Sequence, residues 1–349
     1  MEYSTCRLLI LSCIAVSINM IHSNPLVPAL CIFGDSSMDV GNNNHFMTLL
    51  KANFLPYGRD FITHKPTGRF CNGKLAVDYA AEYLGFKTYP PPYLSATNET
   101  LLTGANFASA GTGFYDKTTL LFQAITLPRQ VSYYEDWRNR VARKVGKERA
   151  YAMISGGIHI LSAGSSDFLQ NYYINPLLNT IYTPSQFSDI LLTSYNTFVQ
   201  KLYQLGVRKI GVTTLPPMGC LPGAITLFGF GTNKCMSRLN DDAMMFNKSL
   251  NETSQKLVAR YRDLKIVVFD IYQPLLDIIT KPSDHGFSES RRGCCGTGIV
   301  EISFLCNAIS IGTCSNATSY VFWDGFHPSE ATNQMLTRKL LMQGLSLIS

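Results

Sequence analysis

The sequence alternates short apolar runs with longer stretches of helical periodicity, and this alternation limits the fold more than any other feature. Four runs are typical of buried strands: residues 29–33, 158–163, 208–215 and 265–271. Glycine or proline follows three of them directly, and such residues end regular structure. A shorter run at 105–108 is a fifth candidate strand. Strands separated by helices favour a parallel sheet covered on both faces, so we predict an α/β fold.

The segments between these runs have the spacing of amphipathic helices. Helices are predicted over residues 131–150 and 184–205, between 243 and 261, and after Ser329. The chain has 349 residues, of which 46% are hydrophobic, and this is ample for one large core. Because no repeat, low-complexity tract or linker divides it, we predict a single domain over residues 24–349.

The N-terminus is typical of an exported protein. Arg7 precedes an apolar stretch at 8–16, and small or polar residues follow around Ser23. This pattern predicts a signal peptide over residues 1–23. A short anchor helix is the alternative, but the apolar stretch is too short to span a bilayer comfortably. We therefore expect a secreted protein, in the extracellular space or the cell wall, without a stable membrane anchor.

Charge argues against nucleic acid as a partner. The net charge of +6 is modest, and no Lys/Arg-rich run concentrates it. No feature of the sequence indicates an oligomeric state.

Cysteines and glycosylation motifs agree with export. Eight of the ten cysteines follow the predicted signal peptide, and six of these lie in two short loops that suit disulfides: Cys220, Cys235, Cys294, Cys295, Cys306 and Cys314. Their pairing stays open. Cys31 is expected to be a buried thiol, and Cys71 is undecided. No Cys-x-x-Cys or paired histidine accompanies the cysteines, so no metal site is predicted.

Four Asn-x-Ser/Thr motifs occur, at Asn98, Asn247, Asn251 and Asn316. In an exported chain they are predicted glycosylation sites.

Candidate chemistry lies just beyond the apolar runs. Ser36, Gly111, Ser166 and the segment 324–327 each follow such a run, and sites gather at the carboxyl ends of parallel strands. Asp324 and His327 form the only Asp-x-x-His of the chain, and a carboxylate can orient an imidazole that acts as a base. Each residue also has a structural interpretation, such as an N-cap serine, a glycine turn or an ordinary buried Asp–His pair. Ser37 competes with Ser36 for either role.

Four blocks together carry a resemblance to a known family. Residues 33–44 (FGDSSMDVGNNN), 106–113 (NFASAGTG), 164–168 (GSSDF) and 323–328 (WDGFHP) resemble the conserved blocks of the plant-type GDSL esterase/lipase family, within the SGNH hydrolase superfamily. Smaller matches are TGRF at 67–70 and LPPMGC at 215–220. The blocks occur in the family's order and span the chain from about residue 29. An ordinary α/β-hydrolase elbow is not expected, because Gly-x-Ser-x-Gly is absent.

The resemblance implies a flavodoxin-like three-layer α/β/α sandwich, the SGNH hydrolase fold, and ester hydrolysis through an acyl-enzyme. By position, Ser36 resembles the nucleophile, His327 the general base and Asp324 its orienting partner. The implied oxyanion donors are the backbone N–H groups of Ser36 and Gly111 and a side chain at Ser166. No metal or organic cofactor is implied.

Residue 166 departs from the family pattern. The family usually has asparagine there, and a serine hydroxyl is shorter and can rotate. Losing one oxyanion donor costs on the order of 10²–10³ in turnover. The expected partner is a lipid or another acyl ester. The alternatives are an acyltransferase that uses the same triad and a binding protein with weak catalysis.

Two apolar segments could line a groove beside the site. They are residues 221–230, between two cysteines, and residues 168–178, after the third block. Packing in the core is the alternative, and for each segment it is slightly favoured.

Overall fold

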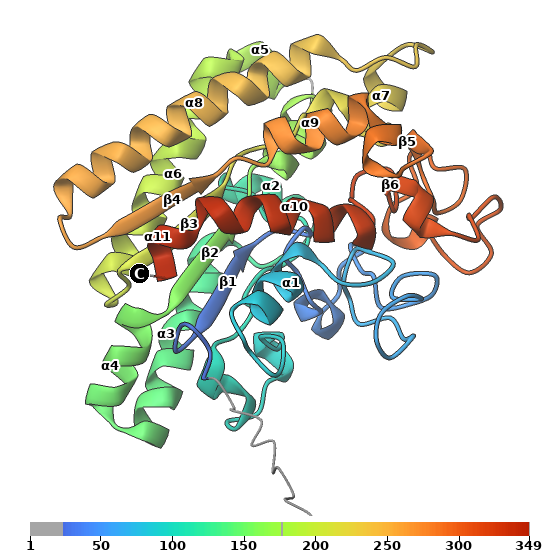
Figure 1. Cartoon of the computed structure of the whole chain (residues 1–349). Coiled ribbons are helices and arrows are strands. Elements are labelled where there is room, and N and C mark those ends of the chain that lie inside the picture. Colours follow the sequence, from blue (N-terminus) through green and yellow to red (C-terminus); the bar gives the residue numbers. More distant parts are fainter. Residues whose placement is uncertain (1–23, 176, 349) are drawn as a thin grey trace, which may run out of the picture.

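A parallel sheet forms the centre of the computed structural model, which describes residues 24–175 and 177–348 (Figure 1). The predicted signal peptide lies outside the described residues. The strands β1 (Leu30–Gly34), β2 (Ile158–Ser162), β3 (Lys209–Thr213) and β4 (Lys265–Phe269) lie side by side in this order. Neighbouring strands all run parallel. The four predicted runs are therefore confirmed as strands; the first is shifted by one residue, and the other three are shorter than predicted.

The fifth candidate run extends the sheet at the free edge of β1. Ile32 donates its backbone N–H to Ala105 (3.0 Å), and Phe107 donates to Ile32 (2.7 Å). Asn106 forms isolated bridges to Ile32 on one side and to Pro92 on the other, so the segment is less regular than the predicted strand. If it is counted in chain order, the strand order becomes 2-1-3-4-5. This is the flavodoxin-like order, whose switch point lies at the first strand.

Helices cover both faces of the sheet and confirm the three-layer fold. One face carries α1 (Ala76–Tyr83), α10 (Glu330–Gln343) and α11 (Leu345–Ile348), and Figure 1 shows α10 lying across the strands. The other face carries α3 (Leu127–Val145), α6 (Pro184–Gln204) and α8 (Ser237–Arg260). The remaining helices are α2 (Asp116–Leu121), α4 (Lys147–Gly156), α5 (Leu178–Ile181), α7 (Pro222–Phe228) and α9 (Tyr272–Thr280).

Side chains of β1 alternate between the two layers. Cys31 and Phe33 face the larger core formed with α3, α6 and α8, whereas Leu30 and Ile32 face the smaller one with α1 and α11. Both sets are buried, so β1 has the continuous apolar sequence of a strand covered on both sides. Cys31 is a buried free thiol, as predicted.

The helix predicted over 131–150 is wrong in its extent. The structure has two helices there, because Gly146 adopts φ +86°, which is outside the α-helical region. The first helix begins earlier than predicted, at Leu127, where the Thr126 hydroxyl accepts from the backbone N–H of Arg129. The helix predicted over 184–205 is confirmed as α6, which begins with a Thr183–Gln186 capping box.

A small second sheet and three disulfides organise the C-terminal third. Strand β5 (Glu289–Gly293) pairs with β6 (Tyr320–Phe322) in parallel. The disulfides join Cys220 to Cys235, Cys294 to Cys314 and Cys295 to Cys306. Cys71, undecided from sequence, is free and buried. None of the helices that the structure describes combines the length and apolarity needed to cross a membrane.

Gln130 on α3 fixes the end of β1, and a substitution there should lower stability. Its fully buried side chain accepts from the Gly34 N–H (2.9 Å) and donates to the Gly34 carbonyl (2.9 Å). We expect Gln130→Leu to lower the free energy of unfolding by about 1–3 kcal/mol, because the buried Gly34 N–H loses its acceptor. Chemical denaturation checks this. The matched control is Gln273→Leu on an exposed face of α9, and equal effects of the two changes would contradict the prediction.

Candidate active site

Ser36 lies on a tight turn at the carboxyl end of β1. Gly34 adopts φ +129°, and a Cβ there would lie 1.9 Å from the carbonyl oxygen of Ser162. Only glycine permits this backbone at such close approach. Asp35 then donates its N–H to the same carbonyl (3.0 Å), which ties the turn to β2. The turn directs the Ser36 side chain into a cavity at the end of the sheet.

Ser36, His327 and Asp324 form a continuous chain of hydrogen bonds. The Ser36 hydroxyl lies 2.7 Å from His327 Nε2. His327 Nδ1 lies 2.9 Å from each carboxylate oxygen of Asp324. Asp324 is fully buried, and His327 is 5% exposed. The structure thus brings together the three residues that the sequence singled out, although they are up to 291 positions apart.

The Asp-x-x-His spacing works because the intervening chain forms a closed turn. Trp323, directly after β6, donates its N–H to the carbonyl of His327 (2.8 Å). Asp324 Oδ1 accepts the backbone N–H groups of Phe326 (2.9 Å) and His327 (2.8 Å). One carboxylate therefore orders its own turn and also receives the imidazole N–H.

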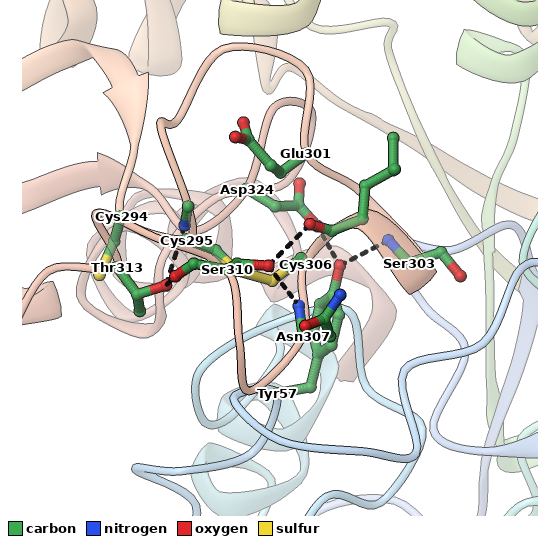
Figure 2. Close-up of a disulfide and its surroundings, with 12 residues drawn as sticks. Tyr57, Cys294, Cys295, Glu301, Ser303, Cys306, Asn307, Ser310, Thr313 and Asp324 are labelled. Carbon is green, nitrogen blue, oxygen red and sulfur yellow. Dashed lines mark hydrogen bonds between the residues drawn. A yellow bond between two sulfur atoms is a disulfide. The ribbon is translucent and has the colours of Figure 1, made fainter.

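Tyr57 holds the other side of this carboxylate, and the sequence analysis missed it. Its hydroxyl donates to Asp324 Oδ2 (2.8 Å) and accepts the backbone N–H of Ser303 (2.8 Å), as Figure 2 shows. Burial and the nearby Asp324 charge raise the pKa of Tyr57 well above its usual value, so the hydroxyl keeps its proton. Ser303 belongs to the loop closed by the Cys295–Cys306 disulfide. No local motif marks Tyr57, because it acts across 267 positions of sequence.

Ser37 occupies a different network from Ser36. Its hydroxyl donates to Asp35 Oδ1 (2.7 Å) and lies 3.2 Å from the Ser162 hydroxyl, which in turn accepts from Thr213 (2.8 Å). Burial raises the pKa of Asp35, while its bonds with Ser37 and the His327 charge act in the opposite direction. Ser37 has a carboxylate partner and no imidazole, so the geometry of a base-activated hydroxyl belongs to Ser36.

The polar residues of the first block hold the second block in place. Asp39 accepts the backbone N–H of Ala110 (3.0 Å). Asn42 donates to the carbonyls of Asn106 (2.9 Å) and Ala108 (2.8 Å), and Asn43 donates to that of Ala110 (3.0 Å). Burial raises the pKa of Asp39 to about 6. Hydrogen bonds from four backbone N–H groups favour its anion and offset part of this rise. These residues act on the backbone around Gly111 and do not reach the Ser36–His327 pair.

The candidate oxyanion donors differ in whether they line the Ser36 cavity. Among the described residues, none accepts a hydrogen bond from the N–H of Ser36 or Gly111, and none pairs with the Ser166 hydroxyl. Ser166 lines the same cavity as Ser36 and His327. Gly111, with φ +89°, does not line that cavity, and a Cβ added there would meet Leu50 and Phe122. Ser166 is therefore better placed toward Ser36 than Gly111 is.

The two apolar segments divide between cavity and core. Leu221 and Leu169 line the Ser36 cavity. Phe168, Tyr172 and Tyr173 pack in the main core, as the alternative interpretation held. Phe230 is 96% exposed.

Among the four predicted glycosylation sites, Asn247 alone has its side-chain amide nitrogen hydrogen-bonded to the backbone of the described chain. Its side-chain amide nitrogen, the atom that would carry a glycan, donates to the carbonyl of Leu215 (3.0 Å), while its oxygen accepts the Leu215 N–H (2.7 Å). Asn98, Asn251 and Asn316 are exposed. A glycan fits these three positions better than Asn247.

Loss of the Tyr57 hydroxyl should lower the reactivity of Ser36 without abolishing it. We expect Tyr57→Phe to slow the reaction of Ser36 with a fluorophosphonate by about three- to tenfold, because Asp324 keeps three other donors but loses one bond to a charged group. Time-resolved labelling checks this. Tyr83→Phe, which changes an exposed hydroxyl, is the matched control. A labelling rate equal to that of the unmodified protein would refute a positioning role for Tyr57.

Comparison with known proteins identifies the family. The family model described as GDSL-like Lipase/Acylhydrolase matches residues 30–340. GDSL esterase/lipase At3g53100 of Arabidopsis thaliana is 63% identical over 93% of this chain and 93% of its own length. GDSL esterase/lipase At5g03810 is 64% identical over the same shares, and GDSL esterase/lipase APG is 54% identical over the whole of both chains, both from the same plant. The chain therefore belongs to the GDSL lipase/acylhydrolase family of hydrolases.

Proposed function

We propose that this protein is a secreted serine esterase that cleaves carboxylic esters through an acyl-enzyme. The observation that carries the proposal is the unbroken hydrogen-bond chain from Ser36 through His327 to Asp324, at the end of a cavity. An imidazole oriented by a buried carboxylate can take a proton from a serine hydroxyl at neutral pH. The family names of the relatives, esterase/lipase, agree with this chemistry.

The reaction follows from the geometry. His327 Nε2 takes the Ser36 proton as Ser36 Oγ forms a bond to the ester carbonyl carbon. The bond from that carbon to the alcohol oxygen breaks, and His327 returns the proton to the departing alcohol. Water, deprotonated by His327, then attacks the acyl-enzyme and frees the acid and the Ser36 hydroxyl. Asp324 stabilises the imidazolium in both halves of the reaction.

The negative charge on the carbonyl oxygen is assigned to three donors. The Ser36 and Gly111 N–H groups are without acceptors in the described chain, and the Ser166 hydroxyl lies in the cavity wall. Donors aimed at this oxygen contribute on the order of 10²–10³ in turnover each.

Export is part of the proposal. The predicted signal peptide at 1–23 and the three disulfides both suit an oxidising compartment outside the cytosol. Asn98, Asn251 and Asn316 would carry glycans there.

Labelling with a fluorophosphonate probe tests the nucleophile directly. We expect the purified protein to be labelled, Ser37→Ala to retain labelling and Ser36→Ala to lose it, because only Ser36 is bonded to His327. Absence of labelling in the folded, unmodified protein would sink the esterase proposal. Product analysis with competing alcohols then separates hydrolysis from acyl transfer.

Variants of Ser166 test the third donor. We expect Ser166→Ala to lower kcat about tenfold or more and Ser166→Asn to leave it within about tenfold, because an amide can donate where the hydroxyl does. Ester turnover with matched protein concentrations checks both. Unchanged kcat in Ser166→Ala would remove Ser166 from the oxyanion site, and a gain above about a hundredfold in Ser166→Asn would show that serine impairs it.

A further inference from the structure

A second, almost entirely apolar groove adjoins the Ser36 cavity. It lies on the face of the sheet that carries α1, α10 and α11. The two spaces share Met38, Ala76, Thr213 and Leu340 in their walls. These four residues lie where the two spaces adjoin, and Met38 is two positions after Ser36 in the sequence.

The groove runs from the carboxyl ends of the strands toward their amino ends. Thr213, the last residue of β3, lines the end of the groove near the Ser36 cavity. Leu30 and Ile158, the first residues of β1 and β2, line the opposite end. A five-residue strand spans roughly 13 Å at about 3.3 Å per residue. The groove therefore extends for about the length of a strand, and Phe269 and Ile160 form part of its floor.

Small residues on the helices leave this space unfilled. Ala76 and Ala80 are one turn apart on α1 and both line the groove, as does Gly344 at the end of α10. Several larger residues around it are only half-buried: Ile160, Phe269, Leu340 and Leu341. Their exposed apolar surface is what a bound alkyl chain would cover.

The groove offers a ligand almost no polar partner. Among the described residues that line it, the polar side chains are those of Thr213 and Thr337. Both hydroxyls already donate within the protein, to Ser162 Oγ (2.8 Å) and to the Asn333 carbonyl (2.8 Å). A charged or hydroxylated occupant would lose its hydration without compensation. A methylene chain instead gains about fourfold in affinity for each group fully buried.

We propose that this groove holds the long alkyl chain of the ester whose carbonyl lies at Ser36. The inference rests on the proposed esterase function and narrows its substrate to long-chain esters. The walls shared with the Ser36 cavity favour the chain of the substrate over an unrelated apolar ligand. The shared chemistry is an unbranched alkyl chain, on either the acid or the alcohol side of the ester.

Filling the groove below its entrance should remove the preference for long chains. Ala80 lines the groove but not the Ser36 cavity. We expect Ala80→Phe to lower the ratio of kcat/KM for p-nitrophenyl laurate to that for p-nitrophenyl acetate by about tenfold or more. Ala152→Phe, at an exposed position of α4, is the matched control and should leave the ratio unchanged. Dodecyl acetate against ethyl acetate repeats the test for a chain on the alcohol side.

An unchanged ratio in both ester series would overturn the proposal. If Ala80→Phe altered the molecular mass in solution and not the ratios, the groove would be an interface between two copies, which also overturns it. A binding experiment tests the groove independently of esterase activity. It measures the affinity of the fluorescent fatty acid cis-parinaric acid for Ser36→Ala, which has no nucleophile. Weaker binding in Ser36→Ala/Ala80→Phe supports the groove even without turnover, whereas equal binding rejects it.

Discussion

The end of β1 is the point on which the rest of the site depends. At Gly34 the chain comes so close to Ser162 of β2 that a side chain has no room. Gln130 of α3 holds the Gly34 peptide groups, and Ser109 of the edge segment donates to the Gly34 carbonyl (2.9 Å). Three segments thus meet at one residue, two positions before the candidate nucleophile. The position of Ser36 is set by backbone hydrogen bonds and packing, so it requires no rearrangement to face His327.

The opposite half of the site is built from the second sheet and its disulfide-closed loops. Asp324 and His327 lie on one turn directly after strand β6. Tyr57 links that turn to the loop inside the Cys295–Cys306 disulfide. Strand β5 ends at Gly293, where a Cβ would contact the backbone of Asp324. The cross-links therefore stabilise the loops that fix the carboxylate, at a distance from the bond-making atoms.

A hydrolytic centre beside an apolar groove accounts for both the polar and the apolar features of the site. The hydroxyls of Ser37, Ser162 and Thr213 form a chain across the strand ends, and the groove begins beyond it. The larger core is densely filled by aromatic residues such as Phe33 and Tyr134, whereas the α1 side carries alanines that face the groove. Incomplete packing on one face of the sheet costs dispersion contacts, and a bound chain would restore them.

The sequence by itself determined the α/β class, the main strands, the buried thiol at Cys31 and the residues to examine, because apolar periodicity and short motifs are local properties. Ser36, Asp324 and His327 stood out through motif and spacing, and their common position beyond apolar runs predicted that they would meet. The break at Gly146 was missed, since glycine inside a helical pattern is often tolerated.

Only the tertiary structure decided the disulfide pairing, the role of Tyr57, the engagement of Ser37 with Asp35 and the contrast between Ser166 and Gly111 around the cavity. Each of these depends on contacts between segments that are remote in sequence or on the direction of a single side chain. Local pattern carries no information on such contacts, because they arise from how the layers pack.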